Sequence, residues 1–170
     1  NMTTLVKPIK YAELAATLAM ALAGKSIQPA IGLDRSAGSF VKYSLPFRKI
    51  LIAEDNLINQ EVIKAYVEKL GVNATIVSSG KEVLSAYERE DYDLILMDIE
   101  MPGMDGVEAT HEIRRREIRK TIRIPILAMT AHAMRGDREE YLAAGMDGYI
   151  SKPIRFVDLT TALSDVATSS

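Results

Sequence analysis

Side chains able to bind a metal ion or a phosphoryl group occur in this chain where short apolar runs stop. They are an acidic pair, a lone acid, a hydroxyl and an amine: Glu54 with Asp55, Asp98, Thr130 and Lys152. Carboxylates bind hard cations, and a carboxylate can also attack phosphorus as a nucleophile. Hydroxyl and ammonium groups donate hydrogen bonds to phosphoryl oxygens. If folding brings these groups together, we expect phosphoryl-transfer chemistry.

The elements that must position these groups follow one pattern from residue 48 onward, in which apolar runs alternate with helical stretches. Strands are predicted near residues 50–53, 73–77, 94–98, 124–130 and 147–150, and helices near residues 57–70, 79–90, 107–120, 132–144 and 155–166. Such alternation predicts an α/β fold with a doubly wound, five-stranded parallel sheet. We expect the flavodoxin-like (βα)5 arrangement with strand order 2-1-3-4-5.

The first of these helices has the strongest pattern. Asn56 is placed to cap its start and Gly71 to end it. Its apolar residues recur every four positions and define a stripe: Ile58, Val62, Tyr66 and Leu70. A stripe of this kind indicates an amphipathic helix packed on the sheet.

In such a sheet the polar groups meet, because open α/β sheets carry their sites beyond the carboxyl ends of the strands. At a separation of about 5 Å, two of the three carboxylates repel each other by roughly 3 kcal/mol at an effective dielectric constant of about 20. The cluster therefore requires a cation. An all-oxygen ligand set without histidine or cysteine favours Mg²⁺, or Mn²⁺ in its place. Asp98, on the central strand, is the expected nucleophile.

Taken together, these motifs resemble those of the receiver domains of two-component response regulators. The resemblance covers residues 48–167 and rests on the Glu54-Asp55 pair and on three further segments: 97–106 (MDIEMPGMDG), 129–131 (MTA) and 151–154 (SKPI). It implies that Asp98 accepts a phosphoryl group from a phosphohistidine. It also implies that Asp55 binds magnesium directly, that Glu54 assists through water, and that the backbone carbonyl of Glu100 is a third ligand.

The resemblance further implies a conformational switch. Lys152 would pair with a phosphate oxygen, and the Lys152-Pro153 peptide bond would be cis. Thr130 would move towards the acyl phosphate and Tyr149 would turn inward behind it, changing the surface built from the helix at 132–144, the strand at 147–150 and the helix at 155–166. An ordinary half-buried aromatic remains the alternative for Tyr149.

Two residues flank the expected pocket. Glu100 lies two positions after Asp98, and His132 lies two positions after Thr130. Both could change how long the phosphoryl group persists on Asp98. The equally weighted alternative is that both are merely exposed to solvent and have no such role.

The N-terminal part of the chain carries an internal repeat. Residues 7–14 (KPIKYAEL) reappear as residues 152–159 (KPIRFVDL). We interpret residues 1–23 as the last helix of a preceding receiver-like domain, residues 24–47 as a linker rich in glycine, proline and serine, and residues 48–170 as the receiver domain. The parent protein is then expected to be a hybrid histidine kinase with tandem receivers, although no kinase core is recognised in these residues and enzymatic activity is left open.

Composition restricts the partners. The formal net charge of −2 gives no basis for nucleic-acid binding. The absence of cysteine fits a reducing compartment, and we expect a cytoplasmic location without membrane contact, while the parent can still be membrane-bound. The expected partners are a histidine kinase domain or a histidine phosphotransfer protein. An apolar stripe on the helix expected at residues 8–22 could support a dimer.

Two other functions remain open at this stage. Phosphatases that form an aspartyl-phosphate carry a second acid two residues after the nucleophile, where Glu100 stands, but no substrate-binding insertion is visible. The second alternative function is a receiver-like interaction module that is never phosphorylated. The basic run 114–116, with Arg119, Lys120 and Arg123, is interpreted as a solvated helix end, with a nucleotide-binding patch as the alternative.

Overall fold

A computed structural model describes residues 45–118, 123–132 and 137–169 of the chain. The expected preceding-domain helix at residues 1–23, and the expected linker up to residue 44, lie outside the described residues, so both stay predictions. Phe47, at the end of the expected linker, is buried in the core together with the first strand.

Five strands form one parallel sheet in the order β2-β1-β3-β4-β5, as predicted. The strands are β1 (Lys49–Ala53), β2 (Asn73–Val77), β3 (Leu94–Asp98), β4 (Ile126–Thr130) and β5 (Gly148–Ser151). All five residues of β3 and of β4 are buried, which explains why these segments are nearly continuous apolar runs. The register pairs Ala53 with Met97 and Asp98 with Met129, so the residues that follow β1, β3 and β4 reach the same edge.

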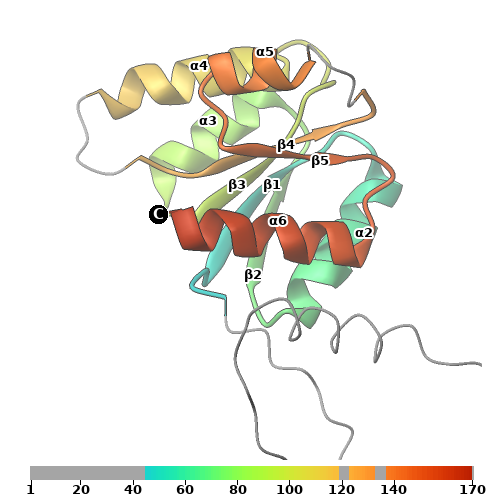
Figure 1. Ribbon diagram of the computed structural model, residues 1–170. Coiled ribbons are helices and arrows are strands. Elements are labelled where there is room, and N and C mark those ends of the chain that lie inside the picture. The colour runs from blue at the N-terminus through green and yellow to red at the C-terminus, as the bar shows by residue number, and fades with distance from the viewer. Residues whose placement is uncertain (1–44, 119–122, 133–136, 170) are drawn as a thin grey trace, which may run out of the picture. The chain divides into compact units, whose positions relative to one another are not determined.

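Helices cover both faces of the sheet (Figure 1). One face carries α2 (Leu57–Lys69) and α6 (Phe156–Ser169), and the other carries α3 (Gly80–Arg89), α4 (Gly106–Glu117) and α5 (Asp137–Ala143). Each face has its own apolar core. Among the described residues no helix is long and apolar enough to cross a membrane.

The face that α2 buries differs from the predicted stripe. Its buried residues are Gln60, Ile63 and Val67, whereas Ile58 is 75% exposed and Val62 is 39% exposed. A step of four residues turns about 40° beyond a full helical turn, so an i, i+4 row drifts away from the sheet. The prediction of a helix was right. The predicted stripe packs on the core at Tyr66 and Leu70 but not at Ile58 and Val62, which leaves apolar side chains in solvent near Asn56.

Three predicted boundaries also change. The helix expected from residue 132 is described from Asp137, and His132 is not helical because its backbone N–H and carbonyl both bond the Thr130 hydroxyl. Strand β4 begins at Ile126 rather than 124, after Pro125, which has no N–H to donate to a ladder. Helix α4 ends at Glu117 rather than near 120, where its carboxylate accepts the Ile124 N–H at 2.7 Å.

Candidate active site

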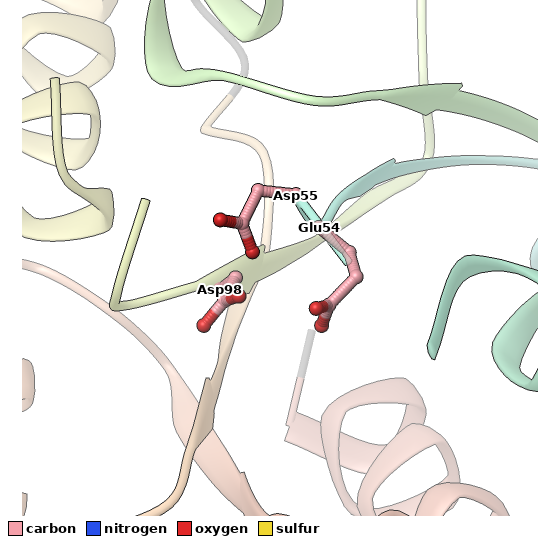
Figure 2. Close-up of side chains that lie close together, drawn as sticks. All are labelled: Glu54, Asp55 and Asp98. Atoms are coloured by element: carbon pink, nitrogen blue, oxygen red, sulfur yellow. The ribbon is translucent and has the colours of Figure 1, made fainter. Parts of the chain in front are cut away.

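Three carboxylates converge beyond the ends of β1 and β3 (Figure 2). Glu54, Asp55 and Asp98 each place one oxygen within 4.8 Å of the others, as the sequence predicted. Glu54 is completely buried, Asp98 is 2% exposed and Asp55 is exposed. The cluster therefore has two carboxylates held by the protein interior and one that faces solvent.

The first turn of α2 holds Glu54 in place. The Asn59 amide donates to Glu54 Oε1 at 2.9 Å, and the Gln60 amide donates to the Glu54 carbonyl at 2.6 Å. The Asn56 side chain caps the helix by accepting the N–H groups of residues 58 and 59. Sequence reasoning missed Asn59 and Gln60. The available signal was the polar Gln60 on the same helix face as Ile63 and Val67.

Lys152 supplies the positive charge of the site. Its ammonium lies 2.6 Å from Asp98 Oδ2 and 2.8 Å from Glu54 Oε2, an oxygen that has no other polar partner in the described residues. The Lys152 backbone N–H donates to the Thr130 carbonyl at 2.7 Å, and the peptide bond to Pro153 is cis, as expected. With three carboxylates and one ammonium, the cluster carries a formal charge of −2 when all four groups are ionised.

Burial disfavours the charged form of both Asp98 and Lys152, but it prevails only for Asp98. It raises the pKa of Asp98 above its ordinary value, and the nearby Glu54 charge adds to the rise, while the hydrogen bond from Lys152 opposes it without cancelling it. For Lys152, burial works against the charged form, but the hydrogen bonds to Asp98 and Glu54 outweigh it and raise the pKa of the ammonium. Lys152 therefore stays charged, whereas ionised Asp98 is costly.

The ligand chemistry fits a divalent cation. Every donor in the cluster is an oxygen, and the formal charge of −2 equals what one such ion neutralises. The Glu100 N–H donates to Asp98 Oδ1 at 3.1 Å, which fixes the loop after β3 against the acceptor carboxylate. The acidic cluster can thus bind a metal ion.

Thr130 ends β4 next to Asp98, but its hydroxyl is engaged elsewhere. It donates to the His132 carbonyl at 2.8 Å, accepts the His132 N–H at 3.0 Å, and lies 3.0 Å from the hydroxyl of Tyr141. The structure therefore places Thr130 at the expected edge without directing its hydroxyl to the carboxylates. Tyr141 was not identified from the sequence, where it has the appearance of an ordinary apolar core residue of α5.

The two flanking residues meet each other. His132 Nδ1 lies 3.0 Å from Glu100 Oε1, with side chains 67% and 63% exposed. This contact joins the loop after β3 to the loop after β4, at the solvent side of the cluster. Neither residue is simply free in solvent, and their effect on phosphate lifetime stays a prediction.

Comparison with known proteins decides the family. The family model of the response regulator receiver domain matches residues 50–164. The chain belongs to the response regulator receiver family. This receiver domain is 47% identical over 112 residues to hybrid signal transduction histidine kinase I of Dictyostelium discoideum. That match covers 63% of the chain and only 6% of the relative.

Solved receiver domains share the fold. The receiver domain of sensor histidine kinase PA1611 from Pseudomonas aeruginosa, which has a magnesium ion in its active-site cleft, is 43% identical with a TM-score of 0.64, covering 72% of this chain and 98% of that one. The receiver domain of Ssk1 from Saccharomyces cerevisiae, solved in complex with the histidine phosphotransfer protein Ypd1, is 26% identical with a TM-score of 0.69, covering 73% and 91%. Residues 50–164 therefore form a receiver domain of two-component signalling.

Tyr149 of this receiver domain, in β5, is partly exposed. It is 38% exposed and lines a surface hollow together with Leu142 of α5 and Val166 of α6. The inward position expected after phosphorylation stays a prediction.

The arginines of α4 pair with acids rather than forming an open basic patch. Arg114 contacts Glu117 at 2.6 Å and Asp147 at 3.1 Å, and Arg115 and Arg116 both contact Glu112. Arg114 is mostly buried, so the interpretation of the run as a solvated helix end was wrong for this residue. Its charge has structural partners, which weakens the nucleotide alternative.

Proposed function

We propose that Asp98 accepts a phosphoryl group from a phosphohistidine in a phosphorelay. One observation carries the proposal: a buried carboxylate lies 2.6 Å from a lysine ammonium inside a carboxylate cluster that fits a divalent cation. In the transfer, an Asp98 oxygen forms a bond to phosphorus while the bond from phosphorus to the imidazole nitrogen breaks. The imidazole leaves neutral after taking a proton from solvent. Lys152 and then Thr130 would hold the phosphoryl oxygens.

Magnesium is the proposed cofactor, with Mn²⁺ as a substitute. Asp55, Asp98 and the Glu100 carbonyl would hold it directly, and Glu54 would assist through water. When bound, the ion neutralises negative charge on the transferred group and on the carboxylates. The magnesium site of the PA1611 receiver domain supports this assignment.

Removal of the metal is expected to lower thermal stability. An ion that binds only the folded state at about ten times its Kd adds roughly 1.4 kcal/mol to the free energy of unfolding. We expect Mg²⁺ to raise the melting temperature of the wild type and EDTA to reverse the rise. Asp55→Asn should weaken Mg²⁺ binding at least tenfold. The matched control Asp91→Asn removes the same charge at an exposed position, and an equal loss in that variant would contradict the assignment of Asp55.

The proposed partner is a histidine phosphotransfer protein or a histidine kinase domain. Three apolar side chains at the start of α2 are exposed directly after the acidic pair: Leu57 (73%), Ile58 (75%) and Val62 (39%). Exposed apolar side chains gathered beside a reactive group indicate a docking surface. The complex of the Ssk1 receiver domain with Ypd1 supports a partner of this class.

Phosphotransfer from such a protein tests the function and its docking surface together. We expect Ile58→Glu to slow transfer to Asp98 by about tenfold or more, as for a central interface residue. Labelling by acetyl phosphate, which needs no docked protein, should be preserved. Ile118→Glu places the same charge at an exposed apolar residue beyond the end of α4. Equal slowing in both variants would refute this surface, and continuous release of phosphate from small phosphomonoesters would favour the phosphatase alternative.

The parent protein is proposed to be a cytoplasmic or membrane-bound hybrid histidine kinase in which residues 1–23 close a preceding receiver-like domain. The repeated Lys-Pro-Ile segment supports this arrangement. We also propose that phosphorylation changes the surface made of α5, β5 and α6 through Thr130 and Tyr149.

A further inference from the structure

The hydroxyl of Thr130 has no hydrogen-bonding capacity left. A hydroxyl has one proton to donate and two lone pairs to accept with. Thr130 donates its proton to the His132 carbonyl at 2.8 Å and accepts the His132 N–H at 3.0 Å. The second lone pair then accepts the proton of Tyr141, whose hydroxyl lies 3.0 Å away. In this arrangement Thr130 cannot donate to a phosphoryl oxygen.

Tyr141 is buried, and among the described residues its hydroxyl is paired with that of Thr130. Its side chain is 5% exposed and packs in the apolar core between the sheet and α3, α4 and α5. Within the described part of the chain, Thr130 is the one polar partner of the Tyr141 hydroxyl. Thr130 itself is 1% exposed, so water does not easily replace either group. The two hydroxyls therefore satisfy each other inside the protein.

Movement of Thr130 towards Asp98 would break this arrangement. The Thr130 hydroxyl would then donate its proton to a phosphoryl oxygen instead of to the His132 carbonyl. The Thr130 oxygen would also move away from Tyr141, whose hydroxyl would lose the acceptor that it has among the described residues. A buried hydroxyl without a partner is unfavourable, because its lost interaction with water is not replaced. Tyr141 thus stabilises the arrangement without a phosphoryl group and destabilises the switched one.

We infer that Tyr141 is a positioning residue that restrains the switch, holding Thr130 until a phosphoryl group on Asp98 competes for its hydroxyl. The inference rests on the proposed function of Asp98 and Thr130. It concerns the equilibrium between the two arrangements of Thr130. Among the described residues the Tyr141 hydroxyl bonds Thr130 and none of the three carboxylates, so we expect its effect to pass through Thr130.

Tyr141→Phe isolates the restraint, because phenylalanine fills the same apolar space and lacks only the hydroxyl. The probe is beryllofluoride with Mg²⁺, a phosphoryl mimic that binds an aspartate without chemistry, followed by NMR of the backbone amides of Asp98 and Thr130. We expect the midpoint concentration of beryllofluoride to fall about three- to tenfold in Tyr141→Phe, the factor that one net hydrogen bond represents. Tyr141→Leu, which also lacks the hydroxyl, should shift the midpoint in the same direction.

A double-mutant cycle assigns the effect to Thr130. In a Thr130→Val background, where no hydroxyl is left to restrain, Tyr141→Phe should leave the midpoint unchanged. A merely structural role for Tyr141 predicts a lower melting temperature with an unchanged midpoint, and that result would overturn the inference. If the wild type does not bind beryllofluoride at Asp98, the proposed function fails and the restraint fails with it. If the wild type binds and Tyr141→Phe binds equally, only the restraint fails.

Discussion

Replacing Lys152 by methionine is expected to lower the free energy of unfolding of the metal-free protein by about 3 kcal/mol, the lower end for breaking a buried ion pair. The change leaves buried Glu54 and Asp98 without the ammonium that lies 2.8 and 2.6 Å from them. Mg²⁺ should restore part of the loss, because it supplies positive charge to the same carboxylates. Labelling by acetyl phosphate should slow by about 10²-fold, as when one donor to a developing anion is removed.

Denaturant unfolding with and without Mg²⁺ measures the first effect, and a labelling time course measures the second. Lys49→Met is the matched control, because Lys49 forms an ion pair with Glu90 at the protein surface. Exposed pairs of this kind contribute little. If both variants lose equal stability, or if Mg²⁺ restores none of the loss in Lys152→Met, the assigned charge balance of the site is wrong.

Asp98→Asn is expected to abolish phosphoryl uptake while stabilising the metal-free fold. Asparagine cannot form an acyl phosphate, so intact mass after treatment with acetyl phosphate should stay unchanged. The melting temperature without metal should rise by a few degrees, because the ionised Asp98 carboxylate is buried beside Glu54 and its pKa is raised. Differential scanning calorimetry in EDTA measures this second effect.

The pH dependence of the free energy of unfolding tests the same destabilisation by ionised Asp98. A carboxyl group whose pKa is higher in the folded than in the unfolded protein binds protons more readily when folded. The wild type should therefore gain stability relative to Asp98→Asn as the pH falls from neutral through the raised pKa of Asp98. This relative gain levels off below the ordinary pKa of aspartate. A relative loss over that range would contradict the assigned cause.

The sequence predicted the sheet and the acidic cluster well, for a local reason. Buried parallel strands require continuous apolar runs, so the end of each run marks where Glu54, Asp98 and Thr130 leave the sheet. The meeting of the carboxylates then follows from the strand order.

What the sequence did not predict depends on side-chain direction. The α2 residues were visible as an apolar stripe, but only packing decides that Ile63 rather than Ile58 faces the sheet. The hydroxyl of Tyr141 in α5 contacts the hydroxyl of Thr130 in β4. The sequence gives no sign of this contact, because an aromatic residue on the apolar face of a helix has the same sequence pattern with or without a polar partner. Lys152 bridges Glu54 and Asp98 in this structure, and its expected pairing with a phosphate oxygen stays a prediction.

Chemical mapping of the phosphoryl group shows which residue accepts it. The protein would be labelled by a phosphorylated histidine phosphotransfer protein in Mg²⁺, reduced with borohydride, which converts an aspartyl phosphate to homoserine, and digested for peptide mass spectrometry. We predict one modified residue, Asp98, and none in EDTA or in Asp98→Asn. Modification at Glu54 or Asp55 in place of Asp98, or a folded protein that takes up no phosphoryl group, would contradict this assignment.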